Sequence, residues 1–266
     1  MSIRLGVVGA LGRMGQAIVL CAQKEADMVV VGATVEPGSP WAGKPLAEAL
    51  PGAGEVLLTD NLEKLLSGTP VDAVIDFSTP SSTAAHAAVC AKAKVALVTG
   101  TTGLSEAEQA VLEAAAKEVP VLWAPNMSVG VQVLSLAVRE VARRLGPKWN
   151  VEVLEIHHKM KKDAPSGTAL KLAEEAALAL GLGKEKLKLA RCGLVGERPE
   201  GEIGVQSLRG GQVVGEHTVF FFGEGERLEL KHCAQSREQF ALGALRAARW
   251  LQAKPAGFYG MGDLLS

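Results

Sequence analysis

The chain has 266 residues, of which 48% are hydrophobic and 4% aromatic, and its 28 Lys and Arg against 29 Asp and Glu give a formal net charge of −1. This length fits one large domain or two ordinary ones, with a core that needs no disulfide or metal support. The balanced charge gives no electrostatic reason to bind nucleic acid or an anionic membrane, and few aromatic residues are present to stack bases.

The cysteines and the hydropathy pattern bear on metal content and location. Cys21, Cys90, Cys192 and Cys233 form no Cys-x-x-Cys pair, so we expect no metal site and instead reduced, buried thiols. No stretch approaches the ~18 apolar residues of a membrane span, and the first residues lack the pattern of a secretory signal. We therefore expect a cytoplasmic protein.

Strand and helix patterns alternate along the first half of the chain. Short apolar runs bounded by glycine, typical of buried strands, alternate with helical patterns. The expected strands are 3–9, 28–35, 71–77, 95–99 and 119–124, and the expected helices are 12–24, 61–66, 80–93 and 105–117. This alternation predicts βαβ units and a parallel sheet with helices on both faces.

A glycine-rich turn joins the first expected strand to the first expected helix. It reads Gly9-Ala10-Leu11-Gly12-Arg13-Met14-Gly15. Such glycines let the backbone approach a pyrophosphate, which the N–H groups of the helix N-terminus attract. Glu36, at the end of the second strand, can accept hydrogen bonds from ribose hydroxyls. The pattern indicates dinucleotide binding; the alternative is a simple strand–turn–helix with a solvated Glu36.

The residue after Glu36 is Pro37, and no adjacent arginine is present to hold a 2′-phosphate. Arg13 or Lys44 could supply a cation there. We therefore expect NADH to be used at least as well as NADPH.

Two further segments follow expected strands at their carboxyl ends, where open α/β sheets bind ligands. They are Gly100-Thr101-Thr102-Gly103 and Ala124-Pro125-Asn126-Met127-Ser128. Their hydroxyls, amide and backbone could hold a nicotinamide carboxamide and ribose. The alternative is that they are ordinary loops in which Ser105 and Ser128 cap the next helices.

The pattern changes after Pro125. Helices are expected at 128–145, 169–180 and 236–252, a loop at 181–202, and strands at 151–157, 203–208, 212–222 and 226–232. The last three strands are expected to form an antiparallel meander. We thus expect a dinucleotide-binding domain at 1–127, joined again by 237–266, and a mixed α+β domain at 128–236 with a mostly antiparallel sheet.

Two adjacent histidines, His157 and His158, end a strand pattern and precede a loop with lysines at 159, 161 and 162. Adjacent strand residues point to opposite faces, so one histidine can act in chemistry while the other packs or holds substrate. Ser166-Gly167-Thr168 then opens a helix, whose N-terminus can bind an anion. The pattern favours a substrate that bears carboxylates; the alternative is structural histidines beside solvated lysines.

The stretch 155–170 contains the string His157-His158-x-x-Lys161-x-Asp163-Ala164-Pro165-Ser166-Gly167-Thr168. This string resembles the signature of the dihydrodipicolinate reductase family of diaminopimelate and lysine biosynthesis. Matches to that family follow in order along the chain: Gly9-x-x-Gly12-Arg13-Met14-Gly15, Phe77-Ser78-x-Pro80, Gly100-Thr101-Thr102-Gly103, Asn126-x-Ser128-Val129-Gly130, Val214-Gly215-Glu216-His217 and Ser236-Arg237-x-x-Phe240-Ala241-x-Gly243-Ala244.

The resemblance implies a fold and an activity. The fold would be an N-terminal Rossmann-type domain plus an α+β domain for substrate binding and tetramerisation. The activity would be reduction of 4-hydroxy-tetrahydrodipicolinate, via dihydrodipicolinate, to tetrahydrodipicolinate with NADH or NADPH. The enzyme would be a homotetramer built through its second-domain sheet. Pro37 departs from relatives that carry arginine there, which bears on the choice of cofactor.

The resemblance also assigns roles to residues. His157 would be the proton donor and acceptor, and Lys161 a proton donor. His158, Gly167 and Thr168 would contact the dicarboxylate substrate. Residues 9–15, Glu36, 100–102 and 124–127 would contact the cofactor.

Two rival functions predict different chemistry. Another Rossmann oxidoreductase, such as a semialdehyde or homoserine dehydrogenase, would need a reactive cysteine or a different lysine–aspartate pair, and no cysteine lies in the histidine–lysine loop. A dinucleotide-sensing regulator would need neither His157 nor Lys161.

Overall fold

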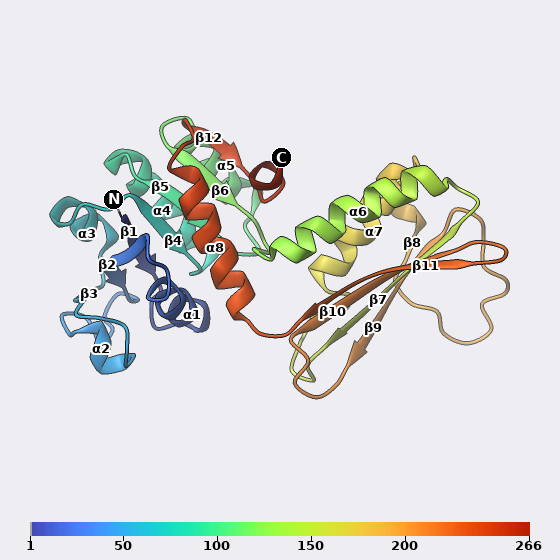
Figure 1. Cartoon of the computed structure of the whole chain (residues 1–266), viewed down its shortest axis with the longest axis horizontal. Helices are drawn as coiled ribbons and strands as arrows, with labels where there is room; N and C mark the ends of the chain where they lie inside the picture. Colours follow the sequence, from blue (N-terminus) through green and yellow to red (C-terminus); the bar gives the residue numbers. More distant parts are fainter. Residues whose placement is uncertain (1) are drawn as a thin grey trace. The chain divides into compact units, whose positions relative to one another are not determined.

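A computed structural model describes residues 2–266 of the protein (Figure 1). The chain divides into two compact units, Met1–Met127 with Arg237–Ser266, and Ser128–Ser236. The first unit is therefore discontinuous in sequence, because the chain leaves it after Met127 and returns to it at Arg237.

A seven-stranded parallel sheet forms the centre of the first unit. In spatial order its strands are β3 (Leu58–Thr59), β2 (Met28–Thr34), β1 (Ile3–Val8), β4 (Ala73–Asp76), β5 (Ala96–Thr99), β6 (Pro120–Trp123) and β12 (Gly257–Tyr259). The expected parallel sheet is thus confirmed. Every residue of β4 and β5 is buried, as in strands that are covered on both faces. The strand order reverses between β1 and β4, the point at which such sheets bind ligands.

Helices cover both faces of this sheet (Figure 1). One face carries α1 (Arg13–Ala22) and α8 (Glu238–Leu251), and the other carries α3 (Leu62–Gly68), α4 (Pro80–Ala93) and α5 (Glu106–Ala115). The short α2 (Leu46–Ala49), the edge strands β3 and β12 and the 3-10 turn η2 (Asp263–Leu265) were not predicted. Each of these elements spans at most four residues, too few for a periodic pattern to emerge.

Arg249 fixes the returning helix α8 to the start of the chain. Its guanidinium pairs with Glu25 at 2.6 Å and with Asp27 at 2.7 Å, in the turn between α1 and β2. Buried alanines on α8, such as Ala244 and Ala248, allow this helix to lie close to α1 and the sheet.

The second unit contains a five-stranded mixed sheet. In spatial order its strands are β11 (Arg227–Ala234), β10 (Gly215–Phe222), β7 (Asn150–His157), β9 (Ile203–Arg209) and β8 (Leu187–Lys188). β10 is antiparallel to both β11 and β7, whereas β9 is parallel to both β7 and β8.

The predicted meander is wrong in one pairing, because β7 lies between β9 and β10. The chain passes from β7 to β9 through α7 (Gly167–Ala179), and a strand that returns after a helical crossover lies parallel to the first. The Arg209-Gly210-Gly211 segment is therefore not a tight hairpin. The predicted loop 181–202 also contains the short η1 (Lys184–Lys186) and β8.

One face of the second sheet is covered by α7 and by α6 (Val129–Leu145), which pack against each other (Figure 1). Ser128 caps α6 by accepting the N–H of Val131 at 3.2 Å, and Ser105 caps α5 in a capping box with Glu108. Capping by both serines was part of the alternative interpretation of these two loops. The core between α6, α7 and the sheet includes Val138, Leu172, Val153, Val219 and Phe221.

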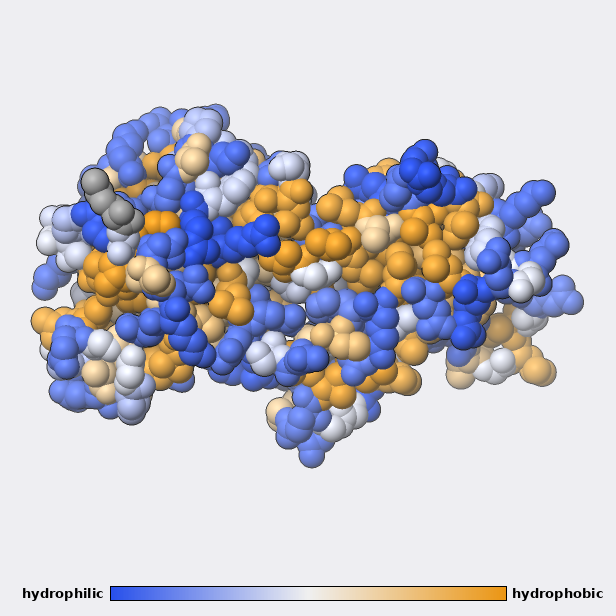
Figure 2. Space-filling model, in the orientation of Figure 1, coloured by the Kyte–Doolittle hydropathy of each residue, from blue (hydrophilic) through white to orange (hydrophobic). Residues whose placement is uncertain are grey.

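The opposite face of this sheet carries the alternate strand positions. Leu154 and Ile156 lie there on β7, and Phe220 and Phe222 lie there on β10 and stack at 5.8 Å. Figure 2 also shows apolar residues gathered over α6 on the displayed face. These four side chains are half-buried, whereas Leu208 on β9 and Val133 and Leu136 on α6 are exposed.

Two expectations from composition can be compared with the structure. Cys21 and Cys90 are buried as expected, but Cys192 and Cys233 are exposed. Cys192 lies in the loop that follows β8, and Cys233 lies on a β11 position that alternates away from the helices. Among residues 2–266, none of the helices combines the length and apolar character that crossing a membrane requires.

Candidate active site

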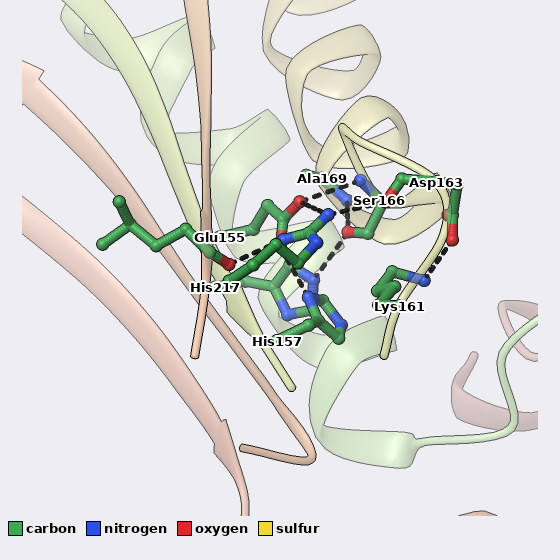
Figure 3. Close-up of polar contacts among 9 residues, drawn as sticks. Glu155, His157, Lys161, Asp163, Ser166, Ala169 and His217 are labelled. Carbon is green, nitrogen blue, oxygen red and sulfur yellow. Dashed lines mark hydrogen bonds and ion pairs between the residues drawn. The ribbon is translucent and has the colours of Figure 1, made fainter. Parts of the chain in front are cut away.

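A buried carboxylate, Glu155, is the centre of a polar cluster in the second unit (Figure 3). Its Oε2 atom lies 2.5 Å from His157 Nδ1 and accepts from an Arg209 N–H at 2.8 Å. Its Oε1 atom accepts from the other Arg209 amino group at 2.7 Å and from the Ser166 N–H at 3.1 Å. Both carboxylate oxygens are therefore fixed by two partners each.

These contacts keep Glu155 ionised. Burial alone would raise the pKa of Glu155, but hydrogen bonds from Arg209 and His157 outweigh it and lower the pKa to about 2. The same carboxylate raises the pKa of Arg209. A buried charge needs such a partner, because an isolated carboxylate in the protein interior would take up a proton and become neutral.

His157 is the last residue of β7 and is 9% exposed. Burial lowers the pKa of His157, the hydrogen bond to Glu155 opposes that shift, and the charges of Lys161 and Arg209 add to it. Glu155 is an acceptor, so His157 Nδ1 carries the hydrogen and Nε2 remains for proton exchange. Nε2 faces Gly215, where an added Cβ would lie 2.9 Å from it.

Lys161 lies on the loop between β7 and α7. Its ammonium lies 2.9 Å from the carboxylate of Asp163, and its side chain is 21% exposed against 59% for Asp163. The ammonium lowers the pKa of Asp163 through this hydrogen bond. Arg209 donates to the Asp163 carbonyl at 2.6 Å. This bond connects the loop to the Glu155 cluster and restrains the backbone near Lys161.

Helix α7 starts beside this cluster (Figure 3). Ser166 is its N-cap and accepts the N–H of Ala169 at 3.2 Å. Gly167 and Thr168 form the first helical positions, at the positive end of the helix dipole. An anionic group is therefore favoured at this helix start.

His217 on β10 completes the cluster. Its Nε2 lies 3.1 Å from Ser166 Oγ, and its ring meets that of His157 edge-on at 5.2 Å. Burial lowers the pKa of His217 to about 4, and the neighbouring His157 adds to the shift. His217 is consequently neutral near pH 7.

The shifted pKa of His217 predicts acid sensitivity of the fold. The unfolded chain takes up this proton near pH 6.5 but the folded protein only near pH 4, so stability falls as the pH is lowered through that window. The linked change is about 3 kcal/mol. Denaturant unfolding at several pH values should show this slope in the wild type and a shallower one in His217→Gln. Equal slopes would contradict the assignment.

His158 lies just past the end of β7 and is half-buried. Within the described chain, its Nδ1 is buried and has no hydrogen-bond partner. The structure thus groups His157, Lys161 and the start of α7, while among residues 2–266 no hydrogen bond joins His158 Nδ1 to that cluster.

The glycine turn of the first unit has the form expected for a phosphate site. Gly9 has a φ of +67°, and the Gly12 N–H closes the turn on the Gly9 carbonyl at 2.9 Å. A Cβ at Gly15 would run into the Gly9 carbonyl and Ala10, so helix and turn approach closely only with glycine. The N-cap, Gly12, provides no side-chain cap for α1, and Glu36 is exposed just after β2.

The threonine segment after β5 is largely bound into the protein. Thr101 accepts from the Thr83 hydroxyl at 2.7 Å, and its carbonyl accepts from Trp123 Nε1 at 2.9 Å. Its N–H donates to Thr99 Oγ1 at 3.2 Å. Thr101 is buried whereas Thr102 is exposed, so Thr102 is the hydroxyl of this segment that solvent reaches.

The segment after β6 lies at the same edge of the sheet. The Ala124 N–H donates to the Thr99 carbonyl at 3.1 Å. Ala124 and Met127 are buried, Asn126 is half-buried, and Pro125 is exposed. Because the strands are parallel, residues 9–15, 36, 100–102 and 124–127 all meet at the carboxyl edge of one sheet.

Three members of the cluster were given no role by sequence reasoning, namely Glu155, Arg209 and His217, and Ser166 was expected only to open the helix. Glu155 carried a usable signal, because it continues the core-facing alternation of Val151 and Val153. A charge at such a position requires a buried partner. The partner, Arg209, is 54 residues further along, and no local pattern connects the two.

Comparisons with known proteins cover both units. The family model described as "Dihydrodipicolinate reductase, N-terminus" matches residues 3–127. The model described as "Dihydrodipicolinate reductase, C-terminus" matches residues 130–265. The two matches together span almost the whole chain.

Individual relatives agree with the family models. The chain is 52% identical over 264 residues to 4-hydroxy-tetrahydrodipicolinate reductase of Myxococcus xanthus, covering 99% of this chain and 97% of that one. It is 44% identical over 266 residues to the reductase of Geobacter metallireducens, with 99% and 98% covered. A solved structure, "Dipicolinate bound Dihydrodipicolinate reductase from Paenisporosarcina sp. TG-14", aligns with a TM-score of 0.79 and 26% identity over 99% of both chains. The chain therefore belongs to the dihydrodipicolinate reductase family.

Proposed function

We propose that the chain reduces 4-hydroxy-tetrahydrodipicolinate, through dihydrodipicolinate, to tetrahydrodipicolinate, with His157 and Lys161 as its proton-transferring groups. Family membership confirms the predicted enzyme class, an oxidoreductase of lysine and diaminopimelate biosynthesis that uses NADH or NADPH. The observation that carries the residue assignment is the buried His157, held by an ionised Glu155 beside the Lys161 loop.

The first unit fits a nicotinamide dinucleotide. The uncapped start of α1 and the close approach at Gly15 leave backbone N–H groups for a pyrophosphate, and the exposed Glu36 can accept from a ribose. We assign cofactor contacts to residues 9–15, Glu36, 100–102 and 124–127. When bound, NADH or NADPH supplies the hydride.

The second unit fits a small dicarboxylate. The start of α7 at Gly167 and Thr168 favours one carboxylate, and the lysines of the preceding loop supply positive charge. His158, with its buried Nδ1, is assigned as a further substrate contact. The solved relative bound to dipicolinate supports this class of ligand.

We assign proton transfer to His157 and Lys161. Loss of water from the hydroxylated substrate gives a conjugated imine, and one hydride and one proton then reduce it. The Lys161 ammonium or the His157 imidazolium delivers that proton directly or through one water. Asp163 holds the Lys161 ammonium at 2.9 Å. Because Glu155 contacts His157 through Nδ1, the other ring nitrogen, Nε2, points away from the Glu155 carboxylate.

The apolar sheet face and the cysteines of the chain bear on its assembly and location. We infer a homotetramer that buries the helix-free face of the second sheet, because Leu154, Ile156, Phe220 and Phe222 would otherwise leave an apolar face in water. A cytoplasmic location accords with the reduced cysteines.

A coupled assay tests the activity and the cofactor choice together. Substrate made in situ by the preceding synthase should cause oxidation of NADH, followed by its absorbance. Since no arginine follows Glu36, we expect kcat/KM with NADH to equal or exceed that with NADPH. A preference for NADPH of about 100-fold, or about 2.7 kcal/mol, would contradict the cofactor inference, and no oxidation of either cofactor would contradict the activity.

A further inference from the structure

We propose that Glu155 and Arg209 form a fixed ion pair that orients His157 and sets the pH range over which it donates a proton. The inference rests on the proposed role of His157, but it concerns two residues that act through His157. They are positioning residues.

The geometry fixes the imidazole through a single nitrogen. Glu155 holds His157 Nδ1 at 2.5 Å, and the carboxylate is held in turn by two bonds from Arg209 and one from Ser166. A bidentate arginine prevents the carboxylate from rotating. At the opposite nitrogen, Nε2 packs against Gly215, where an added Cβ would lie only 2.9 Å away, so the carboxylate holds one side of the ring and a residue without a side chain lies at the other.

The two charges act on His157 in opposite directions. The anion of Glu155 stabilises the imidazolium, and the cation of Arg209 destabilises it. The other groups that face His157 are Lys161, which also disfavours the imidazolium, and the neutral His217. An unpaired carboxylate would keep the imidazole protonated, whereas a carboxylate neutralised by Arg209 leaves it able to lose its proton near neutral pH.

This arrangement predicts opposite effects for two changes that each remove one charge of the pair. Glu155→Gln removes the anion, so the alkaline limb of the kcat profile should move to lower pH, with a loss of about 10-fold in kcat at alkaline pH and a smaller loss at acidic pH. Arg209→Gln removes the cation, so the same limb should move to higher pH. A purely structural role would lower activity in both variants without moving the limb in opposite directions.

The matched control is Glu175→Gln. Glu175 lies on α7, is largely buried and pairs with Arg139 at 2.5 Å, so this change also breaks a carboxylate–arginine pair in the second unit. It should reduce the unfolding midpoint without moving the pH profile. Arg209→Lys retains the charge without the bidentate bond, and its alkaline limb should stay close to that of the wild type.

Proton and nitrogen NMR of the His157 ring gives a readout that is independent of turnover. In the wild type the Nδ1 proton should resonate far downfield, and this signal should be lost in Glu155→Gln while the titration of the ring moves to lower pH. If His157→Gln turns over normally, the catalytic role of His157 fails while the NMR titrations still test the ion pair. An unchanged His157 titration in folded Glu155→Gln or folded Arg209→Gln would overturn the inference.

Discussion

Replacing Lys161 by alanine is expected to lower kcat by about 10²–10⁴-fold, the usual contribution of a general acid. The Lys161 ammonium is shielded and lies 2.9 Å from Asp163, whereas alanine has no proton to give. The dinucleotide residues belong to the first unit, so NADH should bind to the variant with unchanged affinity. Single-turnover kinetics and fluorescence titration with NADH measure the two quantities separately.

Lys171→Ala is the charge-matched control for this experiment. Lys171 lies on α7 of the same unit and is an exposed partner of Gln132, so its loss removes the same charge from a site away from Glu155. Its kcat should match the wild type. Near-normal turnover in Lys161→Ala would reject the role of Lys161 as the proton donor.

His157→Gln is expected to reduce kcat by about 10²-fold or more. Glutamine can still donate a hydrogen bond to Glu155, so the buried Glu155–Arg209 pair keeps a partner and the fold should persist. It cannot carry a proton between pH 5 and 9, so the alkaline limb attributed to His157 should disappear as well. The pH dependence of kcat measures both effects.

A substitution at the neighbouring His158 distinguishes a substrate-binding role from a proton-transfer role. His158→Gln should raise the KM for the dicarboxylate while retaining most of kcat, because His158 is assigned a substrate contact and not proton transfer. Wild-type kcat in His157→Gln, or a dominant loss of kcat in His158→Gln, would mean that the roles of the adjacent residues are misassigned.

The parallel sheet of the first unit was predictable because its signals are local. Buried runs such as those of β4 and β5 are continuous in sequence, and Gly9 to Gly15 marks the first turn. The second sheet was harder to predict, because the neighbour of β7 depends on the long crossover from His157 to Ile203. A three-residue segment such as Arg209-Gly210-Gly211 looks the same whether it ends a hairpin or a crossover strand.

In the candidate site, too, local groupings of residues were predictable from the sequence and long-range contacts were not. His157, Lys161 and Gly167 lie close together in sequence, so one motif contained them all. Arg209 and His217 reach Glu155 and Ser166 only through the register of β9 and β10 against β7. Register follows from the packing of the whole sheet, and a single sequence does not encode it in any short stretch.

The discontinuity of the first unit has a consequence for synthesis on the ribosome. The nascent chain produces β1 to β6 first, but α8 and β12, which complete the sheet and one of its faces, are translated last. Until then the face that α8 will cover, and the open edge of β6, remain exposed to the cell. Unit Ser128–Ser236 is continuous and can finish folding during that interval. Chains truncated before Arg237 should therefore aggregate or be degraded more readily than the full-length protein.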